Sequence, residues 1–157
     1  AGPTHKLRGY AARAYDQGAG RGIWFISGAS VEKAADTIAT MASERRPDLW
    51  AGVGLALCYA GPADSREFMA AKKLAGDHAA DMATGVALAC AARIKDQSLS
   101  PEPREGITAL WGVTPEALAE RVEELRQSIP LSAVADGTGY AAWRKEILHA
   151  FTQNSSA

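Results

Sequence analysis

The stretch Pro47-Asp48-Leu49-Trp50-Ala51-Gly52-Val53-Gly54-Leu55-Ala56 decides the fold, because it starts as a helix and then stays apolar. Proline suits the first position of a helix, and an aspartate in the first turn interacts favourably with the helix dipole. No residue from Leu49 to Ala60 is charged, so we expect this helix to be buried on most sides. The run ends at Gly61-Pro62, a helix stop signal, and is too short to span a bilayer.

The same stretch belongs to a pattern that occurs three times. An aspartate is followed four residues later by glycine, then by a small and an aliphatic residue, and the pattern starts at Asp16, Asp48 and Asp81. A period of about 33 residues is typical of one helix–turn–helix unit. The sequence therefore predicts an all-α fold of stacked helix–turn–helix repeats of about 33 residues, as an α-solenoid-like or compact helical array. The alternative is a coincidence in a chain rich in alanine and glycine.

Capping residues and prolines place the other helices. Ser30, Asp64 and Thr114 are candidate N-caps, and Gly112 and Pro130 are candidate stops. We expect helices over 31–42, 47–60, 64–76, 77–95, 105–111 and 115–129, and a loop over 96–104. A last helix is expected to carry an apolar stripe formed by Tyr140, Trp143, Ile147 and Phe151. Residues 1–153 are expected to form a single helical domain and residues 154–157 a flexible tail.

Charge and cysteine content exclude several classes of function. A formal net charge of −1 gives no electrostatic signature of nucleic-acid or lipid-surface binding. Cys58 and Cys90 sit in apolar stretches and are expected to be buried thiols, with a disulfide or metal pair as the alternative. We therefore expect a cytoplasmic protein without a membrane span. His78, Asp77 and Asp81 are a weak hint of a metal site, but no metal-binding motif supports it, so neither a metal nor a cofactor is predicted.

The three aspartates of the repeat are the candidate catalytic residues. Asp48 and Asp81 lie near predicted helix starts, where a carboxylate has a structural role. The functional alternative is that stacked repeats align Asp16, Asp48 and Asp81 along one groove, where they bind a polar group or act as acids. The sequence leaves both interpretations open.

Aromatic residues and one arginine are the candidate ligand-binding residues. Arg21 lies between Gly20 and Gly22 and could reach an anion, although pairing with a neighbouring acid is the simpler expectation. No strand precedes this glycine-rich segment and no Lys-Ser/Thr follows it, so a nucleotide-binding loop is excluded. The aromatic candidates are expected either in the core or along an apolar tunnel for a lipophilic ligand: Trp24, Phe25, Trp50 and Tyr59.

Three segments resemble an uncharacterised bacterial family. They are Leu7-Arg8-Gly9-Tyr10, then Asp16-Gln17-Gly18 with Gly20–Phe25, and Arg45–Ala56 ending in Tyr59-Ala60-Gly61. The resemblance runs from Leu7 to Phe151 and is weakest over 62–76 and 96–110. Members of that family lie beside iterative polyketide synthases in enediyne and related natural-product clusters, and are about twice as long as this chain. The chain, which begins at Ala1 without a methionine, would match their C-terminal half, as a fragment, a cleaved product or a stand-alone relative.

The resemblance implies a pathway and no catalytic residues. The first hypothesis is an accessory protein of enediyne or polyketide biosynthesis that binds an apolar polyene-type intermediate or a partner enzyme. The second is an enzyme, a cyclase or isomerase, with a buried aspartate as proton donor. The third is a structural helical repeat that docks its own N-terminal half. The family-like positions offered for a site are Asp16, Arg21, Trp24, Asp48 and Trp50.

Overall fold

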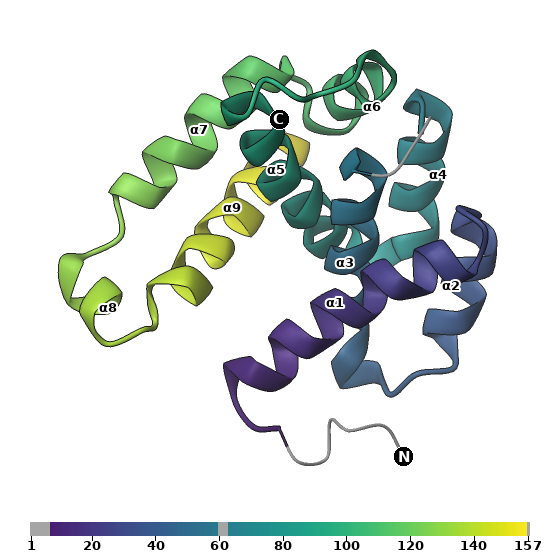
Figure 1. Cartoon of the computed structure of the whole chain (residues 1–157), viewed down its shortest axis with the longest axis horizontal. Helices are drawn as coiled ribbons and strands as arrows, with labels where there is room; N and C mark the ends of the chain where they lie inside the picture. The colour runs from purple at the N-terminus through teal and green to yellow at the C-terminus, as the bar shows by residue number, and fades with distance from the viewer. Residues whose placement is uncertain (1–6, 60–62, 157) are drawn as a thin grey trace.

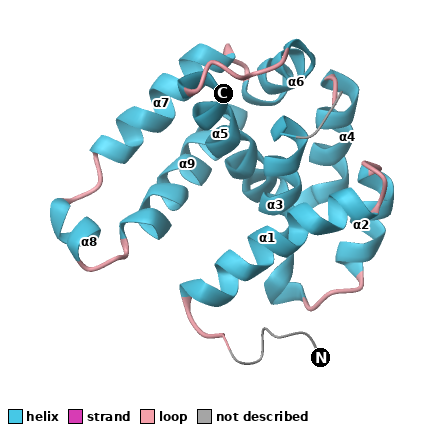
Figure 2. Ribbon diagram, in the orientation of Figure 1, coloured by secondary structure: helices cyan, strands magenta, loops and turns pink. Residues whose placement is uncertain are grey.

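In the computed structural model, the residues that can be described are 7–59 and 63–156, and every regular element among them is a helix (Figures 1 and 2). The prediction of an all-α fold is confirmed for this part of the chain. The helices are α1 (Tyr10–Ile26), α2 (Val31–Ala39), α3 (Arg46–Tyr59), α4 (Ser65–Ala75), α5 (Ala79–Lys95), α6 (Pro101–Trp111), α7 (Pro115–Gln127), α8 (Leu131–Ala135) and α9 (Gly139–Ser155).

The predicted N-caps are confirmed. The Ser30 side chain accepts a hydrogen bond from the Lys33 amide, and Thr114 accepts one from the Ala117 amide. Asp64 accepts from the amides at the start of α4. These bonds satisfy amides that have no partner inside their own helices, so each cap fixes where its helix begins.

Several element boundaries differ from the prediction. The expected loop over 96–104 is wrong at its end, because α6 begins at Pro101. Pro101 and Pro103 fall in the first turn, where an amide N–H would have no helical partner and its loss costs little. The short helix α8 was not predicted, and α9 continues to Ser155, inside the expected tail. The predicted stop at Gly61-Pro62 lies outside the described residues.

Helix α3 lies at the centre of one layer, between α1 and α5 (Figure 1). It is buried on nearly all sides, from Asp48 through Cys58 with Leu55 half-buried, as its uncharged sequence predicts. Glycines allow this: a Cβ at Gly20 of α1 would lie 1.9 Å from the Leu49 carbonyl oxygen, and one at Gly54 would lie 2.0 Å from that of Met82 on α5. None of the described helices has both the length and the apolar character needed to cross a membrane.

The remaining helices cover this layer. Helices α2, α4 and α6 contact one another in that order along one side, while α7 and α9 pack against α5. Helix α8 and the adjoining ends of α7 and α9 project from the body of the molecule, and the start of α9 approaches α1 through the contact of Tyr140 with Tyr10 (Figure 1). The core is continuous from Trp24 of α1 to Phe151 of α9. Two pockets are lined in part by residues of α9, and both are described below as candidate sites.

Candidate functional site

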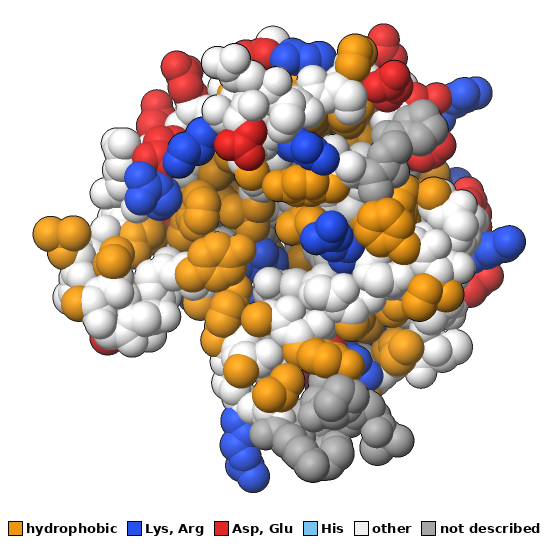
Figure 3. Space-filling model, in the orientation of Figure 1, with side chains coloured by type: hydrophobic (Ala, Val, Ile, Leu, Met, Phe, Trp, Pro, Cys, Tyr) orange, Lys and Arg blue, Asp and Glu red, His pale blue; other side chains and the backbone are white. Residues whose placement is uncertain are grey.

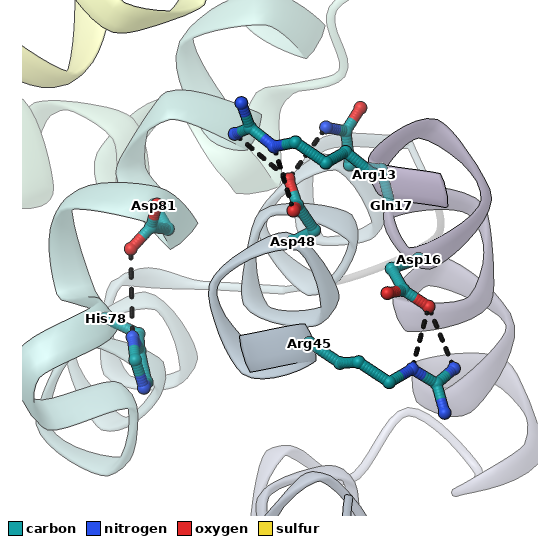
Figure 4. A network of polar contacts seen from close by, with 7 residues as sticks. All are labelled: Arg13, Asp16, Gln17, Arg45, Asp48, His78 and Asp81. Atoms are coloured by element: carbon teal, nitrogen blue, oxygen red, sulfur yellow. Dashed lines mark hydrogen bonds and ion pairs between the residues drawn. The ribbon is translucent and has the colours of Figure 1, made fainter. Parts of the chain in front are cut away.

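Two of the three candidate aspartates are held in ion pairs between elements. Asp48 is buried in the first turn of α3 and accepts hydrogen bonds from Arg13 Nε at 3.1 Å and Gln17 Nε2 at 2.9 Å, both on α1. Asp16, in the middle of α1, is paired with Arg45 at 2.8 Å. Figure 4 shows each carboxylate facing its own cation. Both buried carboxylates therefore have cationic partners, as buried charges generally need.

Asp81 lies in the first turn of α5 and has a weaker partner. Its carboxylate is 3.8 Å from Nδ1 of His78, one turn earlier (Figure 4). Burial raises the pKa of Asp81, and the negative charge of Asp48 adds to the rise, while His78 opposes it. Asp81 therefore holds its proton more tightly than a free carboxyl group does.

Asp81 also lines a pocket between α1, α5 and α9, called here the Arg144 pocket. The pocket has a volume of about 380 Å³. Its polar lining comes from side chains of all three helices and of the turn before α9: Arg13, Asp81, Thr84, Thr138, Arg144 and Lys145. It therefore carries three cationic groups and one carboxylate. The sequence analysis singled out Asp81 but missed Arg144.

The candidate ligand-binding residues do not form one tunnel in the described structure. Trp24 and Trp50 are buried in the core, as the simpler interpretation expects. Phe25, also expected in the core, is 49% exposed. The guanidinium carbon of Arg21 lies 5.8 Å from the centre of the Tyr59 ring. Arg21 makes no ion pair with an acidic residue of the described structure, although such a pair was the simpler expectation.

A larger apolar groove lies between α5, α7 and α9, and we call it the α5–α7–α9 groove. It encloses about 880 Å³. Its floor and walls are formed mainly by Leu88, Ala91, Ile94, Ala119, Val122 and Trp143. Figure 3 shows hydrophobic side chains gathered in a hollow beside α7, with charged side chains around its edge. The indole Nε1 of Trp143 donates to the Val122 carbonyl at 2.9 Å, which fixes α9 against α7 at the groove.

Sequence reasoning missed the groove, although part of its signal was present. Trp143 was placed on the apolar stripe of the last helix, and such stripes are normally buried in the core. Only the arrangement of α7 and α9 around α5 leaves Trp143 half-buried and turned towards open space.

No cluster of three or more histidine, cysteine, aspartate or glutamate side chains suited to a metal ion occurs in residues 7–59 and 63–156. Cys58 and Cys90 are both buried and free. Burial raises the pKa of the Cys58 thiol and raises that of Cys90 to about 12. The prediction of buried thiols is therefore confirmed for these two positions.

A comparison with protein families matches most of the chain. The sequence profile described as Protein of unknown function (DUF1702) matches residues 3–151. No curated protein and no solved structure matches the chain.

Proposed function

We propose a binding function for this chain, which belongs to the DUF1702 family of proteins of unknown function. In this proposal the chain is an accessory protein that holds an elongated apolar molecule in the α5–α7–α9 groove. The size of the groove is the observation that carries the proposal. Its volume of about 880 Å³ falls within the range of about 300–1,000 Å³ that is usual for small-molecule sites.

The lining of the groove supports an apolar occupant. Aliphatic side chains of α5 and α7 form its walls, and Trp143 adds an aromatic ring to the lining. The charged residues are at the edge and have both signs: Glu116, Glu120, Glu123, Lys95 and Arg126. A neutral polyene would bury its length against the aliphatic walls and leave this edge solvated. The enediyne or polyketide setting of the proposal rests on the resemblance alone.

The helix order supports the further proposal that the chain is a stack of helix pairs. Helices α1, α3 and α5 lie side by side, and α2, α4 and α6 follow the same order in the second layer. The glycines of the repeated pattern lie at these contacts, since Gly20, Gly52 and Gly85 each approach the backbone of a neighbouring helix. In such a stack the last pairs supply the binding surface, here α5 with α7 and α9.

Titration with the neutral triene diphenylhexatriene tests the binding proposal. We expect its fluorescence to rise with saturation at one equivalent, and energy transfer from tryptophan to the probe. The variant Ala119→Phe fills the groove from the exposed side of α7 and should weaken binding. Ala117→Phe, on the exposed surface of the same helix, is the matched control. Unchanged binding by Ala119→Phe, or a signal that never saturates, would contradict a site in the groove.

Asp81 supports an enzyme as the second candidate. It has a raised pKa and lines a pocket, whereas Asp16 and Asp48 are tied to arginines. A carboxyl group that keeps its proton nearer neutral pH is better suited to donate it to a polyene. Turnover of a polyene substrate that is abolished by Asp81→Asn, with the fold retained, would favour this candidate over binding alone.

Exposed apolar residues on α8 support the docking candidate. Leu131 is 85% exposed and Val134 is 62% exposed, on a helix that extends from the body of the molecule. If the preceding half of a longer protein covers α8, its addition in trans should protect the amides of 131–135 from hydrogen exchange. No change in exchange at α8 would leave this candidate without support.

A further inference from the structure

Arg144 of α9 is a buried cation without a counter-charge in contact. Only 7% of the residue is exposed, and its Nε lies buried with no hydrogen-bond partner among residues 7–59 and 63–156. No ion pair formed by the described residues includes it. A buried guanidinium normally has its N–H groups paired, because loss of water without replacement bonds is costly.

The side chain lines the Arg144 pocket, and the pocket has an excess of positive charge. Arg13 is already bonded to Asp48 through Nε and Nη2. This leaves Arg144 and Lys145 against the single carboxylate of Asp81. Asp81 makes no ion pair with Arg144, and among the described residues its one contact of this kind is with Nδ1 of His78 at 3.8 Å. One negative group placed in the pocket would balance its charge.

Hydroxyl groups and aromatic rings complete the site. Thr84 and Thr138 are both in the lining, and both hydroxyls already donate: Thr84 to the Ala80 carbonyl at 2.8 Å and Thr138 to the Asp136 carboxylate at 2.6 Å. Arg144 lies with its guanidinium carbon 5.9 Å from the centre of the Tyr140 ring, and Tyr140 contacts the ring of Tyr10 edge-on. The Tyr140 ring therefore lies beside the guanidinium of Arg144, a residue that lines the pocket.

We propose that the Arg144 pocket binds an oxyanion, the carboxylate or phosphate group of a small molecule, through the guanidinium of Arg144 with Lys145 as a second cation. A guanidinium offers two parallel N–H donors that match two oxygens of either group. The pocket lies on the other flank of α9 from the α5–α7–α9 groove, and the two share no lining residue. The proposal therefore stands independently of the apolar ligand.

Nuclear magnetic resonance of arginine side chains tests this directly. The Nε–Hε signal of Arg144 is assigned by its loss in Arg144→Lys, and inorganic phosphate or acetate is then added at constant ionic strength set with sodium chloride. We expect this signal to shift and saturate with at least one of the two anions, and not with chloride. Saturation by phosphate alone identifies a phosphate site, and saturation by acetate identifies a carboxylate site. A signal that follows ionic strength in all three titrations overturns the proposal.

Two variants separate binding from folding. Lys145→Met changes an exposed residue of the lining and should weaken anion binding about threefold. Arg144→Lys keeps the positive charge but loses the two parallel N–H donors, so it should weaken anion binding about tenfold. For Arg144→Lys binding is followed by backbone amide shifts of 138–148. Arg121→Met, an exposed arginine on α7 outside both sites, is the matched control and should bind as the original protein does. Unchanged affinity in both Lys145→Met and Arg144→Lys overturns the proposal.

Discussion

Gly52 of α3 lies directly against the backbone of α1, where a Cβ atom would be 2.1 Å from the carbonyl oxygen of Gln17. Such a distance is far inside van der Waals contact, so no side chain fits at this position unless the helices separate. The contact holds Gln17 beside Asp48, to which its amide donates at 2.9 Å. The close approach of the two helices and the polar network between them therefore require a residue without a side chain at position 52.

Substitution Gly52→Ala should destabilise the protein by at least about 2 kcal/mol, because the methyl group must push apart two backbones that cannot move independently. Gly22→Ala is the control: it lies in the same repeated pattern, but a Cβ there has no neighbour within 4 Å. That variant should be more stable by about 0.5–1 kcal/mol, since alanine is the better helix former. Urea unfolding of both variants checks the pair, and equal effects would contradict the packing role of Gly52.

Asp48→Asn should lower the free energy of unfolding by about 1–3 kcal/mol, because the carboxylate accepts from both Arg13 and Gln17 in a buried position. Glu123→Gln is the matched control: it removes the exposed ion pair with Arg126 within α7 and should change stability little. Chemical unfolding followed by circular dichroism measures both. If Asp48→Asn were as stable as the original protein, the α1–α3 network would have no structural role.

The helices could be predicted because their signals are local. Ser30 and Thr114 mark helix starts by their own side-chain chemistry, and the uncharged run of α3 indicates burial whatever it packs against. The sequence also shows where the glycines are, but it does not show which of them contact a neighbouring helix. Gly20 and Gly22 look alike in sequence, yet Gly20 contacts α3 and Gly22 has no neighbour within 4 Å. Which face of α1 meets the next helix is a property of the assembled layer.

The candidate sites were less predictable, because they depend on contacts between distant segments. Asp16 was a candidate catalytic residue in the sequence, and its partner Arg45 is on another element. Arg144 carried a weak signal that was overlooked, since it follows Tyr140 by four residues and precedes Ile147 by three on the apolar side of α9. A charged residue at that spacing indicates a buried cation and a reason for its burial.

Native Cys58 and Cys90 should resist thiol reagents at mildly alkaline pH. Both are buried, and their raised pKa values keep them as thiols, with the pKa of Cys90 at about 12. Because the thiolate is the reactive form, we expect no modification by Ellman's reagent in the folded protein and modification of both in denaturant. Mass spectrometry counts the labels, and fast labelling of the folded protein would show that these helices open readily.

Asp81 should make stability depend on pH in the opposite sense to an ion-paired carboxylate. Its pKa is raised in the folded state, so the folded protein binds the proton more tightly than the unfolded chain does. The contribution of this group to stability therefore falls as pH rises from the ordinary carboxyl value of 3.8 through the raised pKa, and stays low at neutral pH. Asp81→Asn removes the charge and should be more stable than the original protein at neutral pH, with the difference shrinking as pH falls towards 3.8. Urea unfolding of both proteins across that range gives the difference curve. A curve of the opposite slope would mean that Asp81 is held as an anion by His78 or Arg144, and would count against its role as a proton donor.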